Sequence, residues 1–197
     1  MWLANNDAVL KQATATSDLV ISCERAGPAA DGNCYTMRGI NMNERGLIFP
    51  LHRVPLYAKD IGVKFIAIGD DGNELGMGKV IGKIHEHIPN GEKIGAVTPA
   101  DHLIAASVSN WGAYALIAAA ALVRYNDNSS SSLGDKKEWI DTVLPTEDAE
   151  TKLIHRCVAA GCRDGISGKM EATVDGMPLE RSMECLREIR KAALGEQ

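Results

Sequence analysis

The stretch of the chain that decides the fold is VKFIAIGDDGNELGMG, residues 63–78. Its first part, Val63–Ile68, is a short apolar run, which is typical of a buried strand. The run ends at Gly69 and opens into a loop that is dense in glycine and carboxylate residues. Because α/β proteins place their sites in the loops that follow strands, this stretch predicts both a strand and a candidate site.

Strands and helices alternate on both sides of this stretch. Leu19–Cys23 is predicted to be a second buried strand, and Ile94–Val97 and Leu103–Ser107 are short strand candidates. Gly78–Ile88 and Asn110–Tyr125 are predicted helices, and the second is apolar enough to be fully buried. This alternation predicts an α/β fold with a mostly parallel sheet flanked by helices and a site at the C-terminal ends of the strands.

The two ends of the chain add further elements. An N-terminal helix is expected over Asp7–Thr14, and Thr146 is the predicted N-cap of a helix that ends near Gly161. Met170–Val174 is a predicted small strand, and a last helix is expected to end before Gly195. The core-facing side chains of that last helix are expected to be Leu179, Met183, Leu186 and Ile189.

Length and composition indicate one compact domain. The chain has 197 residues, of which 45% are hydrophobic, so it can bury a core of its own. The polar run at residues 126–135 is interpreted as a flexible surface loop, and residues 1–197 are therefore expected to form a single domain. The longest apolar stretch, Trp111–Val123, is too short to span a bilayer, so no membrane association is expected.

Charge and cysteine content narrow the choice of partners. Lys and Arg number 21 and Asp and Glu number 26, evenly spread, so no nucleic-acid partner is expected. The five cysteines are an odd number without paired spacing, which indicates reduced thiols and an intracellular protein. A small molecule is the expected partner, and the sequence leaves a homo-oligomer open.

The glycines of the loop suggest two nucleotide-binding interpretations, and both fail on detail. Gly76–Lys79 resembles part of a phosphate-binding loop, but Asn73 stands where that motif begins with glycine, and Val80 replaces its Ser or Thr. The glycines at 76, 78 and 82 resemble a dinucleotide fingerprint, but their spacing is one residue too long. No nucleotide cofactor is therefore expected.

A third interpretation makes the carboxylates themselves the site. Oxygen-rich clusters suit Mg²⁺, Mn²⁺ or Ca²⁺ better than zinc. The side chains that supply oxygen are Asp70, Asp71, Asn73 and Glu74 in this loop, joined by Glu24 and Asp31 from the loop after the first strand. A purely structural alternative has Asp70 and Asn73 building turns and Glu74 favouring the start of a helix. The spacing matches no ligand rule, so the residues alone favour neither interpretation.

A further candidate lies at the start of the apolar helix. Ser109-Asn110-Trp111-Gly112 follows a short strand, and Asn110 is placed to cap the helix. The N–H groups of the first turn either serve that cap alone or face an anionic ligand. Asn110 is therefore a candidate substrate contact.

Several of these segments resemble the motifs of one family, the C-terminal domain of D-glutamate cyclase. Gly69–Gly78 is similar to the family's Gly-Asp-Gly-Gly-Asn-Glu-Leu/Ile-Gly-Met-Gly signature, with Asp71 where the family usually has glycine. Further matches follow in the family's order, at Glu24–Arg38, Val108–Leu116, Gly165–Gly168 and Val174–Pro178. Ordered motifs over most of the chain are far more specific than any one of them.

The resemblance carries implications for activity and location. It implies conversion of D-glutamate to 5-oxo-D-proline with loss of water, a hydro-lyase reaction. In animals it implies a mitochondrial enzyme with further N-terminal sequence. The chain is then expected to begin inside the family's domain, without an upstream acidic segment and without a transit peptide.

The candidate residues can be matched to this reaction. Lactam formation needs an uncharged α-amine held against an electrophilic γ-carboxyl, and a divalent cation would polarise that carboxyl. The candidate cation ligands and proton acceptors are Asp70, Glu74, Glu24 and Asp31. Arg25 or Arg38 would bind the α-carboxylate, and backbone N–H groups around Gly76 and Gly78 would stabilise the oxyanion.

Two other functions fit the same residues. A metal-dependent, phosphatase-like hydrolase would use the same carboxylates, with Arg25, Arg38 and Lys79 on the phosphate. A catalytically inactive module would bind a metabolite without turnover, and D-glutamate or its lactam would stabilise it against heat.

Overall fold

The computed structural model describes residues 2–127 and 134–196. The chain divides into two compact units, residues 1–109 and residues 110–197. Most of the surface loop predicted at 126–135 lies outside the described residues. The expectation that the whole chain forms a single domain stays a prediction, and each unit is described by itself below.

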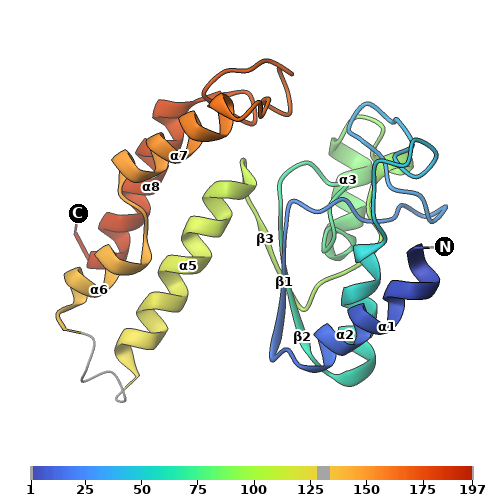
Figure 1. Cartoon of the computed structure of the whole chain (residues 1–197), viewed down its shortest axis with the longest axis horizontal. Coiled ribbons are helices and arrows are strands. Elements are labelled where there is room, and N and C mark those ends of the chain that lie inside the picture. Colours follow the sequence, from blue (N-terminus) through green and yellow to red (C-terminus); the bar gives the residue numbers. More distant parts are fainter. Residues whose placement is uncertain (1, 128–133, 197) are drawn as a thin grey trace. The chain divides into compact units, whose positions relative to one another are not determined.

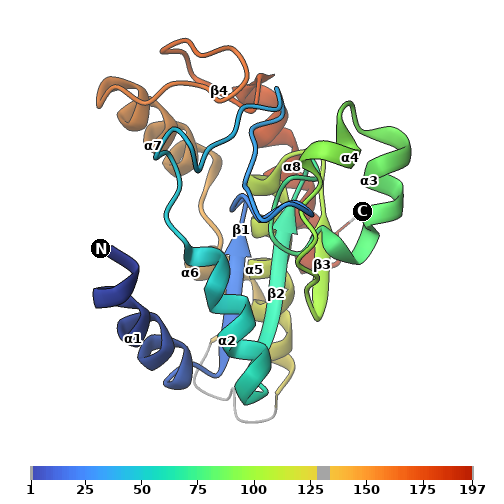
Figure 2. The same cartoon turned by 90° about the vertical axis from the view of Figure 1, so that its right-hand side faces the viewer.

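A three-stranded parallel sheet forms the centre of the first unit. Its strands are β1 (Leu19–Cys23), β2 (Lys64–Gly69) and β3 (His102–Ala105) (Figure 1). They lie side by side in the order β1-β2-β3 (Figure 2). Cys23 pairs with Ile68, and Gly69 pairs with Ala105, so all three strands end at the same edge. The predicted α/β class with a parallel sheet is confirmed.

Short helices flank this sheet, and α2 packs on β1 and β2. The helical elements of the first unit are α1 (Trp2–Ala15), the 3-10 turn η1 (Leu51–Arg53), α2 (Val54–Ile61), the 3-10 turn η2 (Gly78–Val80), α3 (Ile81–His87) and α4 (Gly91–Ile94). The predictions of helices at 7–14 and 78–88 are confirmed. The helical elements η1, α2 and α4 are not among the predicted helices.

The predicted strand over Ile94–Val97 is wrong. Ile94 is the last residue of α4, and the residues after it bond to loops rather than to a neighbouring strand. The Ala96 N–H donates to the Gly72 carbonyl at 3.0 Å, and the Val97 N–H donates to the Pro28 carbonyl at 2.9 Å. The apolar pattern of Ile94–Val97 therefore reflects burial against two loops and not a position in the sheet.

Two small clusters of buried side chains hold the first unit together. Phe65, Ala67, Leu75 and Ala100 pack at the sheet, and Ala29, Tyr35 and Ile94 form a second cluster. The second cluster anchors the loop after β1 on α4. The loops that carry the candidate residues are thus packed parts of the unit.

The second unit is mostly helical. Its elements are α5 (Ser109–Asn126, starting at the last residue of the first unit), α6 (Lys136–Val143), α7 (Glu147–Ala159), the hairpin strands β4 (Thr173–Val174) and β5 (Met177–Pro178), and α8 (Leu179–Leu194). The Thr146 hydroxyl caps α7 by accepting from the Ala149 N–H at 3.1 Å, and Gly195 ends α8 in the left-handed conformation. The predicted start of α7 after Thr146 and the predicted end of α8 before Gly195 are therefore both confirmed.

The prediction that α5 is fully buried is wrong. Ala118 and Ala121 are buried in a cluster with Ile140 and Leu144, but Val123 is 72% exposed and Ile117 is 39% exposed. The many alanines make the helix apolar on all sides, so its sequence hides which face packs. Within residues 2–127 and 134–196, no helix has both the length and the apolar character that a bilayer crossing requires.

Candidate active site

The loops that follow β1 and β2 lie side by side at the carboxyl edge of the sheet. Ala26 and Glu74 form an antiparallel bridge. The Gly27 N–H donates to the Asn73 carbonyl at 2.9 Å, and the Leu75 N–H donates to the Arg25 carbonyl at 2.8 Å. The backbone therefore brings together the two loops that the sequence singled out.

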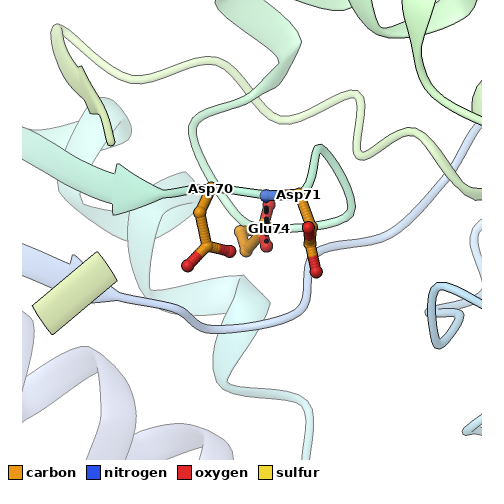
Figure 3. A group of neighbouring side chains, drawn as sticks. All are labelled: Asp70, Asp71 and Glu74. Atoms are coloured by element: carbon orange, nitrogen blue, oxygen red, sulfur yellow. Dashed lines mark hydrogen bonds between the residues drawn. The ribbon is translucent and has the colours of Figure 1, made fainter. Parts of the chain in front are cut away.

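Three carboxylates gather directly after β2. Oxygen atoms of Asp70, Asp71 and Glu74 lie within 4.8 Å of one another (Figure 3), and we call this group the acid cluster. Among the described residues, no other group of three or more Asp, Glu, His or Cys side chains meets the same distance limit. Clustered carboxylate oxygens are the donor set that hard divalent cations prefer.

Glu74 is the buried member of the acid cluster, with only 3% of its surface exposed. Its Oε1 accepts from the Asp71 N–H at 3.1 Å, and its Oε2 accepts from the Gly72 N–H at 2.7 Å. The pKa of Glu74 is raised to about 7, chiefly by burial and in smaller part by the negative charge of Asp70, and the two N–H bonds only partly offset the rise. Glu74 therefore titrates near neutral pH.

Asp70 and Asp71 are half-buried and differ in their contacts. Asp70 Oδ2 accepts from the Ser109 N–H at 2.8 Å, which ties the end of β2 to the first residue of α5. Burial raises the pKa of Asp71, and the charge of Asp70 adds to the rise. The cluster thus holds more negative charge than its surroundings compensate, which favours a proton or a cation at this position.

Gly76 and Gly78 are required by close packing of the backbone. Gly76 has a φ of +97°, and a Cβ atom there would lie 2.1 Å from the Ala67 Cβ. A Cβ on Gly78 would lie 2.2 Å from the Val97 carbonyl oxygen. Both N–H groups donate to the Thr98 carbonyl, at 2.9 and 3.3 Å. The oxyanion role stays a prediction, and in this structure both N–H groups are engaged.

The structure does not bring Glu24 and Asp31 into the acid cluster. Asp31 is exposed and accepts from the Tyr35 hydroxyl at 2.5 Å and from the Asn33 backbone and side-chain N–H groups at 2.9 and 3.0 Å. These bonds, chiefly the one from Tyr35, lower the pKa of Asp31 to about 2. Glu24 is exposed at the end of β1 with a φ of +50°, and its N–H donates to the Ile68 carbonyl at 3.0 Å.

The predicted substrate contacts lie in three different places. The Arg25 Nη2 donates to the Phe49 carbonyl at 2.6 Å, while Arg38 is exposed on the loop after β1. Asn110 is the second residue of α5 and the first residue of the second unit. Because α5 already includes Ser109, Asn110 stands in the first turn of the helix and not at the predicted cap.

Sequence reasoning missed three features of this region. Asp71 belongs to the acid cluster, although it is not among the four predicted cation ligands, and the sequence does not predict the bond from the Ser109 N–H to Asp70. The sequence does not single out His52 in η1, where burial lowers the pKa of the imidazole, as do the charges of Arg53 and Arg25. The motif around Ser109 could have indicated that this segment belongs to the site. His52 stands alone in the sequence, and no motif indicates a role for it.

Comparison with known proteins agrees with the motifs. A family described as D-glutamate cyclase-like, C-terminal, matches residues 4–190. The chain belongs to this family. It is 37% identical over 180 residues to the mitochondrial D-glutamate cyclase of Homo sapiens, a match that covers 86% of this chain and 29% of the human protein. The chain therefore spans less than a third of the length of that relative, and the predicted family resemblance is confirmed.

Proposed function

We propose that this chain takes part in the D-glutamate cyclase reaction, in which D-glutamate becomes 5-oxo-D-proline and water. The observation that carries the proposal is the acid cluster of Asp70, Asp71 and Glu74, formed by the family's glycine-rich motif at the carboxyl edge of a parallel sheet. Edges of this kind are where open α/β sheets bind their ligands. The human relative, which is named for the reaction, supports the same substrate.

The reaction requires mainly that the protein position the two ends of the substrate and control the charge of its ammonium and γ-carboxyl groups. The α-nitrogen forms a bond to the carbon of the γ-carboxyl group, one C–O bond of that carboxyl breaks, and two ammonium hydrogens leave with the oxygen as water. Holding both ends of one molecule in contact supplies much of the acceleration. The protein must then deprotonate the ammonium group and make the γ-carboxyl electrophilic.

The acid cluster suits a divalent cation of the Mg²⁺, Mn²⁺ or Ca²⁺ class. Three carboxylates within 4.8 Å, one of them buried, repel one another, and this repulsion contributes to the raised pKa of Glu74 and of Asp71. Asp70, Asp71 and Glu74 would hold the cation, which when bound would polarise the γ-carboxyl. The donor set therefore fits the group that the chemistry calls for.

Two residues of the neighbouring loop complete the proposed site. Arg25 would bind the α-carboxylate, because its guanidinium is fixed at one end by the Phe49 carbonyl. Glu24 would accept the ammonium proton from the end of β1. Both Glu24 and Asp70 raise the pKa of the Cys23 thiol, after the larger effect of burial, which supports their placement at one edge of the sheet.

The human relative is mitochondrial, and we propose an intracellular, mitochondrial location for this chain on that basis. Reduced thiols are consistent with it, since all five cysteines are free, Cys34 being buried and Cys23 exposed.

The test is direct turnover. The purified chain is incubated with D-glutamate and Mg²⁺, Mn²⁺ or Ca²⁺, and 5-oxo-D-proline is measured by chiral chromatography. We expect turnover that falls about 100-fold in Asp70→Asn and Glu74→Gln, and that is unchanged in Asp60→Asn, which alters an exposed aspartate of α2. Thermal stabilisation by D-glutamate without any lactam would support an inactive binding module instead, and release of phosphate from a generic ester would support a hydrolase.

A further inference from the structure

A pocket of about 390 Å³ lies in the first unit, between α2 and the segment 97–101 that leads into β3. Phe65, near the start of β2, also lines it. The volume falls within the range of small-molecule sites. The residues that line the pocket include no member of the acid cluster, so it is separate from the proposed active site.

Both walls of the pocket are held in place without a ligand. The Val97 N–H donates to the Pro28 carbonyl at 2.9 Å. The Asp101 N–H donates to the Phe65 carbonyl at 3.0 Å, which fixes the other end of the segment. On the opposite wall, α2 packs on the sheet and its Ala58 is fully buried. A pocket that is already formed loses little free energy to ordering when a ligand binds.

The pocket offers apolar surface that is still in contact with water. Leu56 on α2 is 48% exposed, and Val97 on the segment is 44% exposed. Pro99 and Ala100 add further apolar lining. Removing such surface from water is the main favourable contribution to binding, so the pocket suits a ligand with an apolar body.

Two charged side chains line the pocket, and they differ in how they are compensated. Asp101 Oδ1 accepts from the Lys64 Nζ at 3.1 Å, and its Oδ2 accepts from the Phe65 N–H at 2.9 Å. These bonds, chiefly the one from the Phe65 N–H, lower the pKa of Asp101.

Lys59 is the uncompensated charge of the pocket. It lies in the last turn of α2, and within the described part of the chain it has no hydrogen bond or ion pair. Its side chain is exposed, so a ligand can reach the ammonium group, and its flexible stem lets that group follow the ligand. The net charge that the pocket presents to a ligand is therefore a single positive charge.

We propose that this pocket binds a small organic acid, with the anionic group on the Lys59 ammonium and the apolar body against Leu56, Phe65 and Val97. A ligand with one negative charge matches the one lysine. The proposal goes beyond the proposed function, because it concerns a second site whose residues take no part in the cyclase reaction.

Titration of the purified chain followed by amide NMR tests the proposal, since it reports both affinity and location. The probe is 3-phenylpropanoate. Its matched compounds are 3-phenylpropan-1-ol and 3-phenylpropylammonium, which keep the body without the negative charge, and acetate, which keeps the charge without the body. We expect 3-phenylpropanoate to bind, the alcohol to bind about fivefold more weakly, and the ammonium compound and acetate at least tenfold more weakly. The amide signals of residues 56–59 and 97–101 should shift, and those of residues 70–74 should not.

Two variants separate the charge from the apolar wall. Lys59→Gln should weaken binding of 3-phenylpropanoate about fivefold and leave binding of the alcohol unchanged. Leu56→Gln should weaken binding of both compounds by a similar factor, about threefold, because both place the same ring on this wall. Both positions are exposed on α2, so neither change removes a buried contact.

Each variant has a matched control that does not line the pocket. Lys83→Gln removes an exposed lysine of α3, and Ile61→Gln changes an apolar side chain of α2 that is 53% exposed. Neither control should alter binding. The proposal is overturned if 3-phenylpropanoate does not bind, if the alcohol binds as tightly, or if Lys83→Gln weakens binding as much as Lys59→Gln. Shifts confined to residues 70–74 would also overturn it. No turnover is measured, so a failed titration and a failed cyclase assay are separate results.

Discussion

Glu74 in the first unit and Asp164 in the second are both buried carboxylates, 3% and 7% exposed, and both accept backbone N–H groups. Their acidities nevertheless differ. Burial and, to a smaller extent, the charge of Asp70 raise the pKa of Glu74 to about 7. Burial also acts to raise the pKa of Asp164, but hydrogen bonds outweigh it and lower that pKa to about 2.

The difference lies in how each carboxylate is surrounded. Asp164 accepts from the N–H groups of Ile166, Ser167 and Gly176 and from the Thr173 hydroxyl, all at 2.8–2.9 Å. Glu74 accepts two N–H groups and has other carboxylates beside it. A carboxylate whose charge is fully compensated organises a loop, whereas one whose charge is not compensated is available for a proton or a cation.

The largest expected effect is on the second unit. Asp164→Asn should lower the free energy of unfolding of that unit by about 3 kcal/mol, because an amide cannot accept from four donors at once. Urea denaturation and amide hydrogen exchange of residues 164–176 would measure the loss. Asp148→Asn is the control, since Asp148 is exposed at the start of α7 and pairs with Lys152, and it should cost about 0.5 kcal/mol. Similar losses in both variants would contradict the account of Asp164.

The next effect is a pH dependence of the first unit. The folded pKa of Glu74, about 7, lies above the ordinary value, so the folded state binds more protons between about pH 4.5 and pH 7. The stabilisation is therefore complete at low pH and is lost as the pH rises through 7, by up to about 3 kcal/mol.

Unfolding by urea at pH 5 and pH 8 would measure this loss. Glu74→Gln should remove it and be more stable than the parent chain at pH 8. Glu92→Gln, an exposed glutamate of α4, should leave it unchanged. A parent chain with the same stability at both pH values would show that Glu74 is compensated as Asp164 is.

A smaller effect is the stabilisation of the first unit by a divalent cation bound to the acid cluster. At pH 8, Mg²⁺, Mn²⁺ or Ca²⁺ at ten times its dissociation constant should stabilise the first unit by about 1.4 kcal/mol. The gain should be smaller at pH 5, where Glu74 is protonated, and it should disappear in Asp70→Asn. Thermal unfolding with and without the ion would measure it, and an equal gain in Asp70→Asn would place the ion elsewhere.

The smallest effect is on acidity within the acid cluster. Asp70→Asn should lower the pKa of both Glu74 and Asp71, because the charge of Asp70 raises both. The shift should be smaller than the effect of burial, which is the larger cause at each position. Carbon-13 NMR titration of the side-chain carboxyls would measure it, and an unchanged pKa at Glu74 would mean that burial alone controls this group.

The sequence was sufficient for the main features of the fold. The bounds of the strand Leu19–Cys23 were predicted to the residue, because a short apolar run between polar segments is typical of a buried strand. Ile94–Val97 was not, because a buried loop and a buried strand have the same apolar pattern. The exposed face of α5 was hidden by alanines, which suit a core and a surface alike.

The candidate site was predictable only in part. Glycine and carboxylate spacing placed Asp70 and Glu74 in one loop, and they do lie together. The partners of Asp31 depend on a turn that brings Tyr35 and Asn33 back to it, and no spacing rule reports that.

The most direct test of the central claim, that Glu74 is a buried and uncompensated carboxylate, is its own titration. The chain labelled with carbon-13 at the glutamate side-chain carboxyl is titrated by NMR, and Glu74→Gln assigns the signal. The account predicts a midpoint of about 7 without divalent cations and a lower midpoint when Mg²⁺ is added. A midpoint near the ordinary value of about 4.5, unmoved by Mg²⁺, would contradict it.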